Sequence, residues 1–135
     1  MTLYGDPVPD EAAQSRVSND ESDWCIVTVD EVRANMIGTG YPPDRIALVK
    51  GRVENTAAAN APERISLLRL DTDWYSAAQV ELDVFWPRLS RRGVMILDDY
   101  GHYPSQRRAT DEYFANNPQM LSRVDYSCRL VVKTG

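Results

Sequence analysis

The sequence predicts an α/β fold with a mostly parallel sheet. Two apolar runs, Ile65 to Leu70 and Gly93 to Leu97, are nearly continuous, as expected of strands buried on both faces of a sheet. Segments with helical periodicity separate the strand-like runs, and such crossover helices place successive strands parallel to one another. At the C-terminus two short runs follow each other without a helix, which predicts an antiparallel pair.

The organisation of the 135 residues changes near residue 24. Residues 1–23 are poor in aliphatic side chains and rich in Pro, Asp, Glu, Ser and Asn, which is typical of a loop or a disordered segment. Residues 24–135 carry the regular pattern and have the size of a single folded unit.

The first predicted helix spans Val29 to Ile37. Thr28 is its N-cap candidate, and Glu31 follows three residues later, as in a capping box. The segment from Gly38 to Pro43 ends the helix.

The remaining elements are predicted from apolar spacing and from Gly and Pro breaks. In order they are a strand over Arg45 to Lys50, a helical turn over Val53 to Ala59, the strand over Ile65 to Leu70, a helix over Tyr75 to Leu89, the strand over Gly93 to Leu97, a helix over Pro104 to Asn116, and two strands over Leu121 to Tyr126 and Arg129 to Lys133.

Charge and composition exclude several classes of partner. The net charge is −5 and no stretch forms a Lys/Arg stripe, so we expect neither nucleic acid nor an anionic membrane surface as a partner. No apolar run reaches the roughly 20 residues of a membrane span, and the N-terminus lacks the features of a secretory signal. Cys25 and Cys128 lie far apart, which favours two reduced thiols in a cytoplasmic protein over a disulfide.

Acidic residues follow both strong strands. Asp71 and Asp73 come after the first, and Asp98 and Asp99 after the second. The carboxyl ends of parallel strands meet at one edge, and four carboxylates there are unfavourable unless a cation neutralises them or some stay protonated. Carboxylate oxygens without a Cys or His set suit Mg²⁺. Each acid alone could instead cap a helix or face solvent, but the repetition on two strands favours a metal site.

His102, the single histidine, lies in the loop after the second acidic strand. It could act as a base, contact a substrate or be an ordinary surface residue, and the sequence leaves these readings open. Aromatic residues flank the acids and could either pack or line a substrate pocket: Trp74, Tyr75, Tyr100 and Tyr103.

Two segments carry a family resemblance. LLRLDTDWY (67–75) and PRLSRRGVMILDDYG (87–101) resemble the macrocin O-methyltransferase family, whose members methylate sugar hydroxyls of macrolide and aminocoumarin antibiotics. The similarity extends upstream to the GYPxDR turn (40–45) and Val49-Lys50-Gly51, and downstream to Phe114. It covers about residues 24 to 133.

The resemblance implies a class I methyltransferase (Rossmann-like) fold, S-adenosylmethionine (AdoMet) as methyl donor and Mg²⁺ to orient the acceptor hydroxyl of a small molecule. The site residues it implies fall into three groups. Asp71, Asp98 and Asp99 would be metal ligands, Asp73 would be a general base, and Lys50, Gly51 and Asp71 would contact the cofactor. His102 stays a further catalytic candidate because of its place in the loop, not because of the resemblance.

One part of the family pattern has no counterpart in the sequence. The Gly-rich loop after the family's first strand, and the acid after its second, precede anything present here. We therefore expect a sheet that lacks the first two strands of the order 3-2-1-4-5-7-6, and a truncated chain that neither binds AdoMet tightly nor methylates alone. Either the strand over Arg45 to Lys50 pairs with Ile65 to Leu70 to give five strands, or another chain fills the gap.

Two other functions stay open. In a metal-dependent nucleotide-sugar glycosyltransferase, Asp71-x-Asp73 would be the metal-binding DxD motif. In the second alternative function, the chain is a non-catalytic subunit that pairs with a complete methyltransferase. Association with a further copy or with a separate N-terminal segment is also open.

Overall fold

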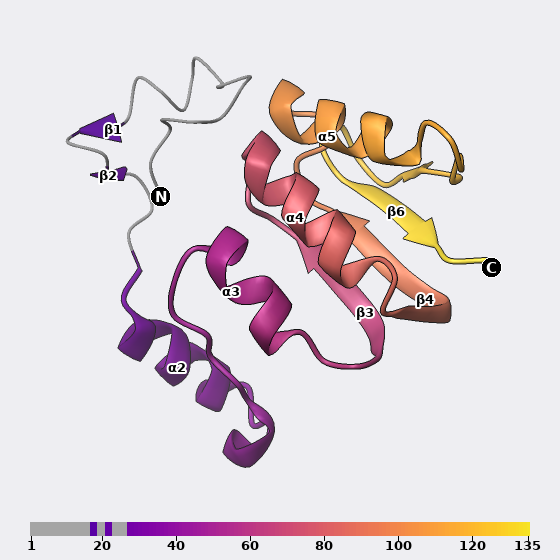
Figure 1. The fold of residues 1–135 in the computed structure, drawn as a ribbon. Helices are drawn as coiled ribbons and strands as arrows, with labels where there is room; N and C mark the ends of the chain where they lie inside the picture. The colour runs from indigo at the N-terminus through magenta and orange to yellow at the C-terminus, as the bar shows by residue number, and fades with distance from the viewer. Residues whose placement is uncertain (1–16, 19–20, 23–26) are drawn as a thin grey trace.

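The computed structural model describes residues 17–18, 21–22 and 27–135, and its elements are shown in Figure 1. They are β1 (Val17–Ser18), β2 (Glu21–Ser22), α2 (Val29–Gly38), the 3-10 helix η1 (Pro43–Arg45), α3 (Val53–Asn60), β3 (Ile65–Leu70), α4 (Tyr75–Phe85), β4 (Leu89–Leu97), α5 (Pro104–Phe114), β5 (Ser122–Arg123) and β6 (Arg129–Val132).

The main sheet has four strands in the order β3-β4-β6-β5. β3 and β4 are parallel, with Leu68 opposite Met95 and Leu70 opposite Leu97, and α4 is the crossover between them. β6 pairs antiparallel with both β4 and β5. The α/β class and the C-terminal antiparallel pair are confirmed, but the sheet is mixed, so the prediction of a mostly parallel sheet is wrong.

The predicted strand over Arg45 to Lys50 does not form. Arg45 closes η1, and residues 46–50 run without pairing to any described strand. Strand propensity stabilises a segment only where a neighbouring strand accepts its hydrogen bonds. β3 consequently has one described neighbour, β4, and its other edge carries no described strand, so the five-stranded alternative does not form.

The helices α3, α4 and α5 lie on one face of the sheet (Figure 1). Beneath them the two strong strands bury alternate side chains, while on the opposite face Leu67 is 66% exposed. The prediction that these strands are buried on both faces is therefore wrong. The core is one-sided and consists of Leu68, Leu70, Met95, Leu97 and Val131 from the sheet with Leu82, Trp86 and Phe114 from the helices.

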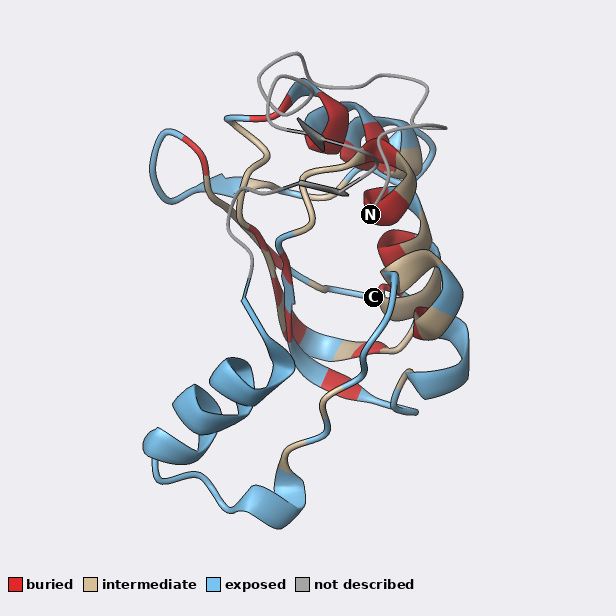
Figure 2. Cartoon of the chain, turned by 90° about the vertical axis from the view of Figure 1, so that its left-hand side faces the viewer, coloured by how far each residue is buried: buried red, intermediate tan, exposed pale blue. Residues whose placement is uncertain are grey.

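The helix α2 has a capped N-terminus and no buried residue. Thr28 Oγ1 accepts from the Glu31 amide at 3.2 Å, and Glu31 Oε2 accepts from the Thr28 amide at 2.8 Å, which confirms the predicted capping box. None of the residues of α2 is buried, and Figure 2 shows the helix projecting from the rest of the chain. The capping hydrogen bonds stabilise this arm, and its Val29 and Val32 share a hollow with Leu48 and Val49.

The N-terminal part and the helix ends differ in detail from the expectations. β1 and β2 form an antiparallel pair inside the segment predicted as a loop, and the rest of residues 1–23, like Cys25, lies outside the described residues. α4 ends at Phe85 because Pro87 cannot continue a helix, and Leu89 begins β4 instead. Within the described part of the chain, every helix is too short or too polar to cross a membrane.

Gly101 lets two loops meet beside the carboxyl end of β4. Its amide donates to the Ser127 carbonyl at 2.7 Å, and a Cβ atom on it would lie 1.9 Å from the Tyr126 carbonyl oxygen. Only a residue without a side chain permits this approach.

We expect Gly101→Ala to lower the free energy of unfolding by about 1–3 kcal/mol, the usual cost of overpacking. Gly38→Ala is the matched control, because a Cβ there meets nothing within 4 Å and alanine is the better helix former. Urea denaturation of both variants checks this. Equal stability of Gly101→Ala and wild type would show that the two loops do not depend on this contact.

Candidate metal centre

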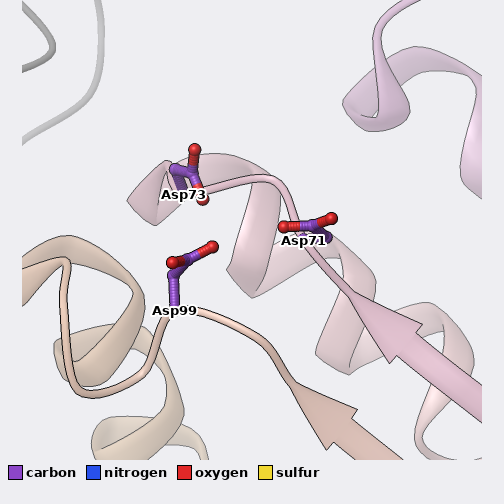
Figure 3. A group of neighbouring side chains, drawn as sticks. All are labelled: Asp71, Asp73 and Asp99. Atoms are coloured by element: carbon purple, nitrogen blue, oxygen red, sulfur yellow. The ribbon is translucent and has the colours of Figure 1, made fainter. Parts of the chain in front are cut away.

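The acids that follow the two parallel strands meet at one edge of the sheet. β3 and β4 end side by side, and the Asp98 amide extends their pairing by donating to the Leu70 carbonyl at 3.1 Å. Carboxylate oxygens of Asp71, Asp73 and Asp99 lie within 4.8 Å of one another. Figure 3 shows these three side chains directed toward a common space. The predicted convergence of acids is confirmed for these residues.

The fourth acid, Asp98, is held by an arginine. Arg69 Nη2 lies 2.8 Å from Asp98 Oδ2 and 2.8 Å from Asp71 Oδ2, so one guanidinium joins the two carboxylates. Arg69 was not predicted from the sequence as a site residue. Its position near the end of β3, two residues before Asp71, was the available signal.

Asp73 occupies a strained turn. Its φ is +65°, and the Trp74 amide donates to the Thr72 carbonyl at 2.7 Å across it, which is the hydrogen bond of a γ-turn. Aspartate tolerates this left-handed conformation better than most residues, yet such strain costs about 1–3 kcal/mol and concentrates at functional sites.

Buried polar side chains from α4 and α5 hold this edge together. Thr72 Oγ1 donates to Glu81 Oε2 at 2.9 Å, and Ser105 Oγ donates to the Asp73 carbonyl at 2.6 Å. Gln106 Oε1 accepts from the Asp99 amide at 3.1 Å. These three supporting residues were not predicted from the sequence, and Ser105 and Gln106 lie on a buried face of α5 that also carries Thr110.

Burial and neighbouring acids disfavour ionisation of the carboxyl groups at this edge. Burial raises the pKa of Asp73 to about 7, with further contributions from the hydrogen bond and charge of Asp99. Burial likewise raises the pKa of Asp71 to about 6, against the attraction of Arg69. Arg69 therefore offsets the charge on one side of the group, whereas Asp73 is surrounded by other acids.

The donor atoms fit a hard divalent cation. Asp73 Oδ1 is buried without a hydrogen-bond partner, which is costly unless another group contacts it. The group offers only carboxylate oxygens, the ligands that Mg²⁺ prefers. An ion coordinated here would relieve the crowding that raises both pKa values.

The structure places the other predicted site residues outside this group. The His102 amide donates to the Asp99 carbonyl at 2.9 Å, and His102 lines a cavity of about 380 Å³ beside α5. Lys50 and Gly51 follow the unpaired segment after η1, and Gly51 has a φ of +136°. The geometry thus unites three of the four acids and leaves these residues separate from them.

The flanking tyrosines make defined contacts. The Tyr100 hydroxyl donates to Asp111 Oδ1 at 2.6 Å, and the Tyr75 hydroxyl donates to Glu112. Tyr103 is buried, and its ring packs edge-on against that of His102. Tyr103 packs and also lines the cavity beside α5 together with His102.

Glu81 makes the stability of the fold depend on pH. It is 5% exposed, and burial raises its pKa from 4.5 to about 7. Since the folded state holds this proton more tightly than the unfolded chain, stability falls as pH rises through this interval.

We expect Glu81→Gln, which keeps an acceptor for Thr72 but cannot ionise, to gain stability relative to wild type between pH 4.5 and pH 8, by at most about 3 kcal/mol. Thermal unfolding across this range measures the difference, and Glu63→Gln controls for loss of an exposed carboxylate. A Glu81→Gln minus wild-type difference that stays constant with pH would contradict the assignment.

The sequence is similar to known O-methyltransferases. The model of the macrocin-O-methyltransferase (TylF) family matches residues 3–132. Curated relatives include a mycinamicin III 3''-O-methyltransferase from Micromonospora griseorubida, 35% identical over 82 residues, and a demethyldecarbamoylnovobiocin O-methyltransferase from Streptomyces niveus, 29% identical over 89 residues. These matches cover 61% and 66% of this chain but 32% and 34% of the relatives, so the chain spans about a third of their length.

Solved structures agree with the fold. The O-methyltransferase NovP superposes with a TM-score of 0.76 at 26% identity, over 81% of this chain and 46% of NovP. CalS11, a TDP-rhamnose 3'-O-methyltransferase, superposes with a TM-score of 0.59 at 20% identity, over 76% of this chain and 48% of CalS11, which supports the fold alone. The relatives do not favour the glycosyltransferase alternative. Since the family model matches nearly the whole sequence, the chain belongs to the macrocin-O-methyltransferase family.

Proposed function

We propose that this chain carries the metal and acceptor side of an O-methyltransferase that transfers a methyl group from AdoMet to a hydroxyl of a sugar or other natural product. The observation that carries the proposal is the convergence of Asp71, Asp73 and Asp99 at the carboxyl edge of two parallel strands. Relatives named as sugar and antibiotic O-methyltransferases support the substrate class.

In the proposed site, Asp71 and Asp99 would hold Mg²⁺ together with Asp98, which in this structure is paired with Arg69 outside the three converging carboxylates. Bound Mg²⁺ lowers the pKa of a hydroxyl that it contacts. Arg69 aligns two of these carboxylates through its shared contacts at 2.8 Å. It also limits the charge that accumulates before an ion binds.

Asp73 is the proposed general base and accepts the proton of the acceptor hydroxyl at Oδ1. This oxygen has no hydrogen-bond partner among the described residues, so its lone pairs are not engaged by the protein. A pKa of about 7 also suits a base that works near neutral pH. His102, on the loop after Asp99, is the second candidate for a substrate contact.

The metal assignment predicts that Asp99→Asn and Asp98→Asn each weaken Mg²⁺ binding several-fold or more, because each removes one charge from a hard-ion site. Isothermal titration calorimetry measures the affinities, with Asp83→Asn as the control at an exposed carboxylate on α4. Undiminished affinity in the Asp98→Asn, Asp99→Asn double variant would refute the site. A larger loss for Asp73→Asn than for Asp98→Asn would exchange the roles of these two residues.

The proposed cofactor contacts are Lys50, Gly51 and Asp71. In this structure the segment before Lys50 is unpaired, so no sheet edge brings Lys50 and Gly51 to the carboxylates. We expect the 135-residue chain to bind AdoMet more weakly than the micromolar range and to methylate nothing alone.

Equilibrium dialysis of the 135-residue chain against AdoMet, and in parallel against UDP with Mg²⁺, checks this expectation. Micromolar AdoMet binding would show that the cofactor site is already complete. Tight UDP binding would instead favour the glycosyltransferase alternative.

A further inference from the structure

We propose that Glu81 and Ser105 are positioning residues that hold Asp73 in its left-handed conformation. The inference rests on the proposed function in one respect, namely that Asp73 is the base. The hydrogen bonds themselves are features of the chain and can be tested without a metal, cofactor or substrate.

The turn needs external support because its own geometry is strained. A positive φ at a residue with a Cβ atom is sparsely populated and persists only where the surroundings determine it. The described residues other than glycine with positive φ are Asp73 and Arg92, both at +65°. The internal hydrogen bond from Trp74 to Thr72 closes the turn but does not by itself require a positive φ at Asp73.

Ser105 holds the turn from the side of α5. Its hydroxyl donates to the Asp73 carbonyl at 2.6 Å, and the side chain is 1% exposed, so water cannot easily replace it. Its neighbour Gln106 accepts from the Asp99 amide at 3.1 Å. Two adjacent residues of one helix therefore set Asp73 and Asp99 relative to each other.

Glu81 holds the turn from the side of α4. Its carboxylate accepts from Thr72 Oγ1 at 2.9 Å, one residue before Asp73. A buried acid on a helix face that otherwise packs against the sheet is costly, and the hydrogen bond to Thr72 is the contact that compensates it. Two different helices thus contact the turn, α5 at the Asp73 carbonyl and α4 at the Thr72 side chain.

The consequence concerns the direction of the Asp73 side chain. A change of φ from positive to negative rotates the Cα–Cβ bond about the fixed backbone, and the carboxylate would leave the space it shares with Asp71 and Asp99. Removal of either support should therefore misplace Asp73 while the sheet and the metal-side acids stay in place.

The test is solution NMR of the full 135-residue chain, which reads φ from backbone coupling constants and Cα chemical shifts. In wild type both Asp73 and Arg92 should give the left-handed signature. Ser105→Ala and Glu81→Leu should abolish it at Asp73 and retain it at Arg92, and the Trp74 amide should exchange with solvent roughly tenfold faster or more.

Two further variants separate positioning from general stability. Thr110→Val removes another buried hydroxyl from α5, one that bonds only to the Gln106 carbonyl within the helix, and should leave Asp73 unchanged. Glu81→Gln keeps an acceptor for Thr72 and should retain the wild-type left-handed signature at Asp73.

An unchanged left-handed Asp73 in both Ser105→Ala and Glu81→Leu would overturn the inference, as would equal effects from Thr110→Val. If Asp73 responds as expected but wild type binds no Mg²⁺, the positioning role stands and the proposed metal site fails.

Discussion

The parallel pairing of β3 and β4 is the interaction on which the rest of this structure depends. Both strands end at the same level, and the bond from the Asp98 amide to the Leu70 carbonyl carries the pairing to the first acid. Every acid that follows is thereby delivered to one edge of the sheet. The same pairing places Leu70 and Leu97 side by side in the core under the helices. The register of β3 and β4 therefore determines both the core and the position of the acids.

This convergence is electrostatically unfavourable, and the chain offsets it unevenly. Arg69 bridges Asp71 and Asp98, whereas Asp73 and Asp99 face each other among acids. Two buried side chains, Glu81 and Ser105, hold the strained turn on that second side. This crowding costs stability, and the proposed cation would relieve it.

Much of this could be predicted from local sequence. The apolar runs of β3 and β4, the capping box at Thr28 and the acids after each strand are signals carried by neighbouring residues. The segment from Arg45 to Lys50 has an equally strand-like pattern, but a strand also needs a partner, and no local signal says whether one is present. The one-sided burial of the sheet has the same cause, because burial depends on what covers each face.

The supporting residues of the site were beyond prediction for a related reason. Glu81, Ser105 and Gln106 act through contacts made 9, 32 and 7 residues away along the chain. Their sequence signal is only a polar residue where a helix should be apolar. The ion pair of Arg69 with Asp98 likewise spans 29 residues and appears only once β3 and β4 are aligned.

The most direct test of the central claim is a crystal structure of the chain grown with Mn²⁺, which replaces Mg²⁺ at carboxylate sites and scatters anomalously. The account predicts one anomalous peak at the edge of β3 and β4, within coordination distance of Asp71 and Asp99. Strong peaks elsewhere on the described surface, with none between these two carboxylates, would contradict it.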